Sequence, residues 1–114
     1  MRLRDIVHRV VVDARKLTDY ALDPENPIGR HKATVFEHCL GFTRDNYVLL
    51  LQQVESRVLD TDAHLQRTDQ HGQHYRVDVE VTGTEGQQEI VQTGWLVARG
   101  SDEARLVTLY VRRS

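Results

Sequence analysis

Three basic or titratable side chains, Arg30, His31 and Lys32, directly follow Gly29 in this chain of 114 residues. A helix that begins here leaves backbone amides without partners, and free amides beside cations attract an anion. The segment lacks a glycine-rich phosphate loop. The alternative interpretation is therefore that these residues face solvent, with the Lys32 stem along the edge of the core.

A second set of candidate residues lies in the C-terminal half, where apolar and polar side chains alternate. We expect Ile90, Leu96, Val107, Leu109 and Val111 to join the valines that face the core. The opposite face then carries Arg76, Asp78, Thr93, Trp95, Thr108, Tyr110 and Arg112. Cross-strand pairing predicts one row of Arg76, Trp95 and Thr108, and a second row of Asp78, Thr93 and Tyr110.

This polar face suggests RNA cleavage without a metal ion. Such a reaction needs a base for the 2′-hydroxyl, a proton donor for the 5′-oxygen and positive charge for the phosphate. The pattern predicts no base on the face, and only His31, His38 or His74 could approach it. The alternative is a solvated face whose aromatic and threonine pairs stabilise the sheet.

Metal and thiol chemistry are disfavoured. The pair His71 and His74 spans a predicted turn, and His31 and His38 have no further ligand at suitable spacing. We expect no metal and no cofactor. The single cysteine, Cys39, lies near a predicted helix C-terminus, where the helix dipole disfavours a thiolate, so it is interpreted as inert.

The N-terminal half predicts helices, after a short strand or extended lead-in at residues 6–12. Asp13 is a possible cap for a helix over residues 14–22, which the prolines in DPENP terminate. A second helix begins at Gly29, buries Ala33, Phe36 and Leu40, and ends at Gly41. Thr43 caps a third helix that continues to about residue 59.

The C-terminal half predicts an antiparallel β-meander. Strands are expected at about residues 63–68, 75–82, 88–99 and 105–112, separated by polar and glycine turns. Gly94 in mid-strand indicates a bulge or a close backbone approach. The expected fold is a single α+β domain over residues 1–114. Its helical part, at about 13–59, packs on one face of a four-stranded antiparallel β-meander at about 63–112.

Composition narrows the function classes. The net charge is −2 and the pI about 6.3, which disfavours a general basic surface for nucleic acid. The longest apolar run is too short to span a bilayer, and charges near the N-terminus interrupt any signal-peptide core. We therefore expect a cytoplasmic protein with no membrane partner.

Several motifs resemble a bacterial family, domain of unknown function 6883. They are Lys16 with Tyr20 and Leu22, Gly29 with Lys32, Ala33 and Phe36, Leu40-Gly41, Thr93-x-Trp95, and Leu106-x-Thr108-x-Tyr110. The family is similar to small toxin modules, and the order of elements resembles the barnase, colicin and RelE-like ribonuclease fold. In several such toxins the closing strand carries an active-site threonine, which corresponds here to Thr108.

The resemblance implies a toxin that acts as a metal-independent RNA endonuclease and is neutralised by a neighbouring antitoxin or immunity protein. The expected catalytic residues are Lys32, Arg76, Thr108 and Tyr110. The expected substrate-binding residues are Lys16, Arg30, His31, Thr93, Trp95 and Arg112. The alternative is a non-catalytic protein-interaction module that uses the exposed sheet face or an edge strand.

Overall fold

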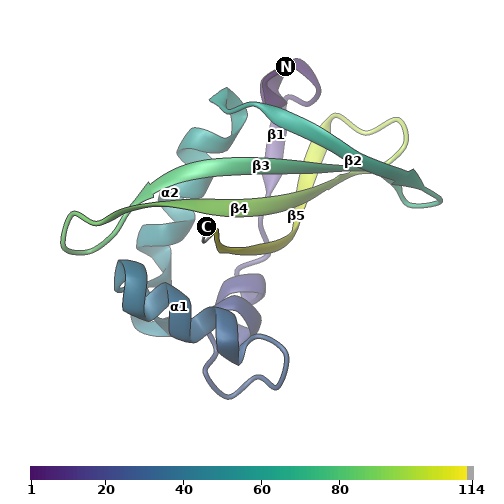
Figure 1. The fold of residues 1–114 in the computed structure, drawn as a ribbon. Helices are drawn as coiled ribbons and strands as arrows, with labels where there is room; N and C mark the ends of the chain where they lie inside the picture. Colours follow the sequence, from purple (N-terminus) through teal and green to yellow (C-terminus); the bar gives the residue numbers. More distant parts are fainter. Residues whose placement is uncertain (113–114) are drawn as a thin grey trace.

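The computed structural model describes residues 1–112, which form an α+β fold built on a mixed sheet. Within this part of the chain the sheet has five strands in the order β1-β5-β4-β3-β2 (Figure 1). The strands are β1 (Arg9–Val11), β2 (Ala63–Asp69), β3 (Gly72–Thr82), β4 (Gln88–Val97) and β5 (Glu103–Val111).

Strands β2 to β5 form the predicted antiparallel meander, but the prediction of a purely antiparallel four-stranded sheet is wrong. Strand β1 pairs in parallel with the start of β5, with Arg9 opposite Glu103 and Val11 opposite Arg105. The β-branched residues of this segment do favour a strand. Its partner lies at the far end of the chain, and local sequence patterns carry no information about such a pairing.

The helices follow the predicted segments with shifted boundaries. The two α-helices are α1 (Arg30–Leu40) and α2 (Tyr47–Arg57). Short 3-10 turns are η1 (Leu3–Asp5), η3 (Arg44–Asn46) and η4 (Val58–Asp60). In place of the first predicted α-helix there is a π-helix, η2 (Leu17–Ala21), in which the Leu22 amide donates to the Leu17 carbonyl at 2.8 Å.

The predicted end of α1 and the following cap are both present. Gly41 ends α1 in the left-handed conformation, with φ of 76°. The Thr43 side chain then accepts a hydrogen bond from the Asp45 amide at 3.2 Å, and the Asn46 side chain bonds back to the Thr43 amide at 2.7 Å. Thr43 caps the 3-10 turn η3, which leads directly into α2, so the three residues of η3 separate the cap from the α-helix itself.

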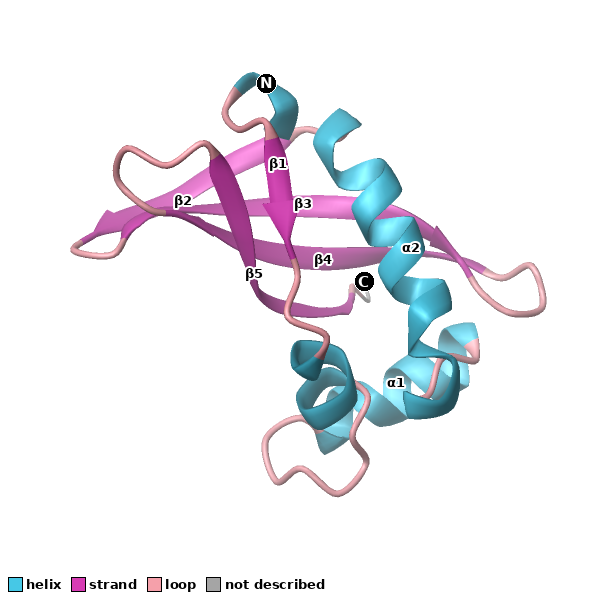
Figure 2. Ribbon diagram, turned by 180° about the vertical axis from the view of Figure 1, so that it is seen from behind, coloured by secondary structure: helices cyan, strands magenta, loops and turns pink. Residues whose placement is uncertain are grey.

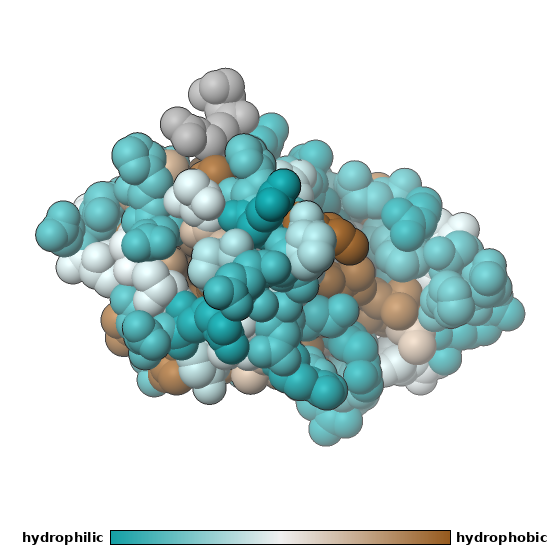
Figure 3. Space-filling view, turned by 90° about the horizontal axis from the view of Figure 1, so that it is seen from below, coloured by the Kyte–Doolittle hydropathy of each residue, from teal (hydrophilic) through white to brown (hydrophobic). Residues whose placement is uncertain are grey.

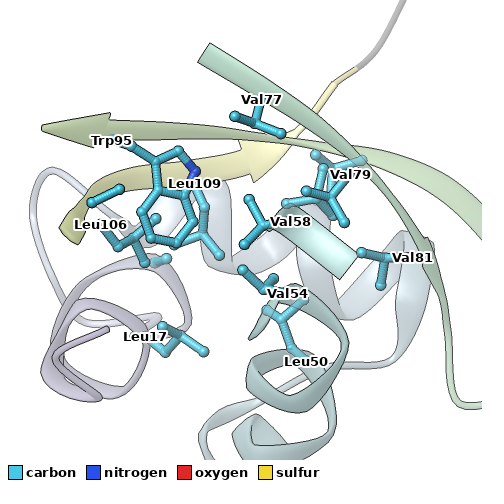
Figure 4. Packing of buried hydrophobic residues seen from close by; sticks show 14 of the residues in the cluster. Leu17, Leu50, Val54, Val58, Val77, Val79, Val81, Trp95, Leu106 and Leu109 are labelled. Carbon is cyan, nitrogen blue, oxygen red and sulfur yellow. The ribbon is translucent and has the colours of Figure 1, made fainter. Parts of the chain in front are cut away.

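The helices do not cover the sheet evenly. Figure 1 looks onto an open sheet face, and Figure 2 shows α2 packed against the opposite face. In both views α1 lies below the curved last part of β5, at the margin of the sheet. The core therefore lies between α2 and one sheet face, where Leu50, Val54 and Val58 meet Val77 and Val79 (Figure 4).

The predicted register of β4 is wrong by one residue. Thr93 and Trp95 face the core, with exposed fractions of 0% and 1%, whereas Ile90 is 37% exposed. Trp95 packs beside Leu106 and Leu109 (Figure 4). Its Nε1 donates to Thr93 Oγ1 at 2.7 Å. The Thr93 hydroxyl donates to the Val77 carbonyl at 2.6 Å, so this buried threonine satisfies the indole N–H.

The bulge predicted from Gly94 is present and re-aims β5. Gly94 pairs with Thr108, whereas the next residue, Trp95, pairs with Leu106, so Val107 is the extra residue. Val107, predicted to be in the core, is 40% exposed. Beyond the bulge Leu109 returns to the core, and Thr108 and Tyr110 face the open side.

Candidate functional site

The Lys32 side chain connects three segments that are distant in sequence. It extends from α1, and its Nζ donates hydrogen bonds to Tyr20 Oη at 2.7 Å and to Thr108 Oγ1 at 3.0 Å. Tyr20 belongs to η2 and Thr108 to β5. We call Lys32, Tyr20, Thr108 and the neighbouring Tyr110 the ammonium site.

Lys32 reaches Thr108 around the margin of the sheet. Strand β1 pairs only with the first residues of β5, up to Arg105, so the later part of β5 has no strand on its outer edge. Both α1 and η2 pack against β5 instead. Gly29 allows the start of α1 to approach η2 closely, because a Cβ at this position would overlap the Tyr20 carbonyl oxygen.

Two aromatic rings surround the ammonium group. Lys32 Nζ is 4.7 Å from the centroid of the Tyr20 ring and 5.4 Å from that of Tyr110. Both distances lie in the range of a cation–π interaction. The rings and the two hydroxyls hold the charge partly buried without neutralising it.

Among the described residues, no carboxylate forms an ion pair with this cation. Within residues 1–112, the ion pairs involve neither Lys32 nor Lys16. An ammonium group has three N–H donors, and two of those on Lys32 are used by Tyr20 and Thr108. The third donor and the full positive charge are available to an anionic ligand.

Two shallow hollows adjoin the ammonium site. The first hollow, of about 590 Å³, is lined by Asp13, Arg15, Lys16, Asp19, Tyr20, Val107 and Thr108. The second hollow, of about 390 Å³, is lined by His31, Lys32, Val35, Tyr110 and Val111. Viewed from below, the surface is mostly hydrophilic, with hydrophobic side chains visible between polar ones (Figure 3). Tyr20 lines the first hollow and Tyr110 the second; Lys32 lies near both rings and itself lines the second hollow.

The acidic groups of the first hollow differ in their partners. The Arg15 side chain bonds to Asp13, with Nη2 to Oδ2 at 2.7 Å, and this lowers the pKa of Asp13 from 3.8 to about 2. Asp13 therefore carries a charge already paired with Arg15. Asp19 also lines the hollow; its carboxylate accepts from the Thr18 hydroxyl at 3.2 Å and lies 4.0 Å from Arg44 Nη2.

The structure divides the predicted catalytic residues. Lys32 and Thr108 are in contact, and Tyr110 lies beside them. Arg76 lies two strands away, opposite Gly94, which in turn lies opposite Thr108. Arg76 therefore shares the open face with Thr108 but belongs to a different strand.

The predicted substrate-binding residues are divided as well. Lys16 lines the first hollow and His31 the second. Arg112 bonds to Asp78 at 2.8 Å on the open face. Arg30 is exposed at the first position of α1.

The candidate amide cradle at the start of α1 is reduced, because several of its amides already have protein partners. The Asn26 side chain accepts from the amides of Ile28 and Gly29, both at 2.9 Å, and its carbonyl accepts from the Arg30 amide at 2.9 Å. These amides are therefore already satisfied.

The placement of Thr93 and Trp95 on an exposed polar face is also wrong. Both are buried between the sheet and the helices, and their polar atoms bond to each other. Trp95 is therefore in no position to stack on a nucleobase. The predicted rows become Arg76–Gly94–Thr108 and Asp78–Gln92–Tyr110.

The expected site residues do not include Tyr20, although Tyr20 belongs to the sequence motif given above with Lys16 and Leu22. The sequence does single out the two basic residues around Tyr20: Lys16 and Lys32 are the chain's only lysines among 15 Lys and Arg residues. Both adjoin Tyr20 in the fold. Lysine carries a compact charge on a flexible stem, and it is not interchangeable with arginine.

Three features of the described residues concern other classes of site. Across residues 1–112, no group of three or more His, Cys, Asp or Glu side chains is arranged to hold a metal ion. Cys39 is a half-buried free thiol. None of the helices in this part of the chain has the length and apolar character needed to cross a membrane.

Comparison with known proteins identifies the family of this chain. No curated protein and no solved structure matches the chain. A family model described as a domain of unknown function, DUF6883, matches residues 2–113 and so covers nearly the whole sequence. The chain therefore belongs to the DUF6883 family.

Proposed function

We propose that this protein is a metal-independent RNA endonuclease whose reaction takes place at the ammonium site. One observation carries the proposal: Lys32 is a partly buried cation that two hydroxyls hold in place and no described carboxylate neutralises. Preorganised positive charge of this kind stabilises a phosphate on which negative charge develops. Lys32 would supply charge that a metal ion supplies in other nucleases.

The reaction is transfer of the phosphoryl group within the RNA chain. The 2′-oxygen bonds to phosphorus while the bond from phosphorus to the 5′-oxygen breaks. The 2′-hydroxyl loses one proton and the 5′-oxygen gains one, so the products are a 2′,3′-cyclic phosphate and a 5′-hydroxyl. Lys32 donates to a non-bridging oxygen, and Thr108 and Tyr20 fix the position of its ammonium group.

The two hollows suit this geometry. The attacking and leaving oxygens lie on opposite sides of phosphorus, so a phosphate on Lys32 extends one side toward each hollow. Asp19 lines the first and His31 the second, and each can accept or release a proton. Lys16, also in the first hollow, adds a second positive charge for the RNA backbone.

RNA cleavage in a bacterial cytoplasm would make the protein a toxin. A neighbouring antitoxin or immunity protein would neutralise it by covering the two hollows and withholding Lys32 from RNA.

One observation favours a second function, a non-catalytic protein-interaction module. Strand β2 is an edge of the sheet, and five of its seven residues are exposed. A partner strand could pair with this edge. Variants of the ammonium site discriminate the two functions, because β2 lies at the opposite edge of the sheet from β1 and β5.

The test is expression of the protein in a bacterium, followed by growth measurement and sequencing of RNA ends. Wild-type protein should arrest growth and generate new 5′-hydroxyl ends, and Lys32→Ala should do neither. The matched control is Arg99→Ala, which removes one positive charge at the exposed turn between β4 and β5 and should behave as wild type. Trp95 emission reports whether each variant is folded.

Two results would count against the proposal. One is folded wild-type protein that produces no new RNA ends. The other is equal cleavage by Lys32→Ala. Binding of a partner that survives both Lys32→Ala and Thr108→Ala, without any cleavage, would favour the interaction module.

A further inference from the structure

Arg76 and Thr108 are aligned across the open face of the sheet. Arg76 in β3 pairs with Gly94 in β4, and Gly94 pairs with Thr108 in β5. Two strand spacings therefore separate Arg76 from Thr108, a Cα distance of about 10 Å. Figure 1 looks onto this face, which α2 does not cover. A ligand on Lys32 can extend over Gly94 toward Arg76 without crossing another element.

Gly94 has no side chain, so the strip of sheet surface between Arg76 and Thr108 is not raised by one. A Cβ at Gly94 would meet only Thr108 atoms within 4 Å: its Cγ2 at 3.1 Å and its carbonyl oxygen at 3.9 Å. The space above Gly94 on the Arg76 side is therefore open. The Thr108 methyl group lies against Gly94, while the Thr108 Oγ1 faces Lys32.

Arg76 has an incompletely paired guanidinium group. Its Nε is buried and has no hydrogen-bond partner among the described residues; the nearest carboxylate oxygen, Asp78 Oδ1, is 3.5 Å away. The other oxygen of Asp78 already accepts from Arg112 at 2.8 Å. Arg76 and Arg112 thus share the one carboxylate of Asp78. Because the Arg76 side chain is 32% exposed while its Nε is buried, its terminal Nη groups are the donors left for a phosphate.

We propose that Arg76 binds a second phosphate of a single-stranded RNA that runs from Lys32 across Gly94. This inference rests on the proposed function and deepens it. Lys32 holds the phosphate that reacts, and Arg76 holds one that does not. Arg76 is then a substrate-binding residue, and its contribution depends on the length of the RNA. A dinucleotide, with its one phosphate on Lys32, would not reach Arg76.

The experiment uses the two lysines as probes. Selective ¹³C labelling of lysine gives signals from Lys16 and Lys32 alone, so titration yields an affinity at the ammonium site. The ligands are 2′-O-methyl RNAs, which cannot be cleaved: a dinucleotide with one phosphate and a heptanucleotide with six. Each is titrated at several salt concentrations into wild type, Arg76→Ala, Arg76→Lys and Arg99→Ala.

We expect Arg76→Ala to weaken heptanucleotide binding at least about tenfold. The slope of log affinity against log salt should fall by about 0.7. Dinucleotide binding should not change. Arg76→Lys should retain the slope, because the charge remains, and Arg99→Ala should match wild type. Trp95 emission verifies that Arg76→Ala is folded. Arg76→Lys gives a second affinity measurement in which the positive charge at position 76 is retained.

The outcomes separate the two proposals. Equal loss for both RNAs would place Arg76 at the reacting phosphate and overturn the inference. The inference is also overturned if Arg76→Ala binds the heptanucleotide with wild-type affinity while that binding still shifts the Lys32 signal. If neither RNA shifts the Lys32 signal of wild type, the proposed function falls and this inference falls with it.

Discussion

Replacement of Thr93 by valine removes a buried hydroxyl while keeping the side-chain shape. Trp95 Nε1 then loses its 2.7 Å acceptor inside a core that excludes water, and the Val77 carbonyl loses its 2.6 Å donor. An unsatisfied buried donor costs about 1–3 kcal/mol, so with the weakened carbonyl we expect Thr93→Val to lose about 2–3 kcal/mol. For a chain of 114 residues, this lowers Tm by about 8–12 °C.

The assay is urea or thermal unfolding followed by fluorescence of Trp95, which is the chain's single tryptophan. The matched control, Thr93→Ser, keeps the hydroxyl and loses one methyl group, which costs about 1 kcal/mol. The order of stability should be wild type, then serine, then valine. On an exposed strand valine is favoured over serine, so the reverse order of the two variants would refute the buried hydrogen bonds described above.

Three further predictions concern other parts of the molecule. Asp13 should titrate at about pH 2 by NMR and shift toward 3.8 in Arg15→Gln. Because its pKa is lowered by folding, its stabilising contribution is present above about pH 4 and lost as the pH falls toward 2. Gly41→Ala forces a Cβ into a φ of 76° and should lose about 1–2 kcal/mol in chemical unfolding. Thr108→Val removes one acceptor from Lys32 and should slow RNA cleavage by about 10- to 100-fold in single-turnover assays, with the fold unchanged.

Much of the fold follows from local patterns in the sequence. The apolar stripe of α1, the left-handed Gly41 and the Thr43 cap each depend on neighbouring residues, and all three are present. The register of β4 cannot be predicted from local patterns, because both faces of the strand contain apolar residues. Ile90 and Leu96 lie on one side, and Val91, Trp95 and Val97 on the other. The face of β4 that is buried is the one with Trp95, whose indole N–H donates to the Thr93 hydroxyl on the same face.

The ammonium site was predictable only in part. Lys32 and Thr108 were identifiable as separate candidates, but their contact depends on α1 lying beyond the free edge of β5. That edge is free because β1 is short and parallel, a pairing between opposite ends of the chain. Tyr20 could not be assigned from periodicity, since a π-helix turns it differently from an α-helix.

The most direct test of RNA cleavage at Lys32 is a product-end measurement on purified protein. Wild type and Lys32→Met are incubated with a defined single-stranded RNA in excess chelator, and the product ends are identified by mass spectrometry. Wild type should yield 2′,3′-cyclic phosphate and 5′-hydroxyl ends, and Lys32→Met should be slower by about 100-fold or more. Intact RNA with folded wild type, or the same products at the same rate from Lys32→Met, would contradict the account.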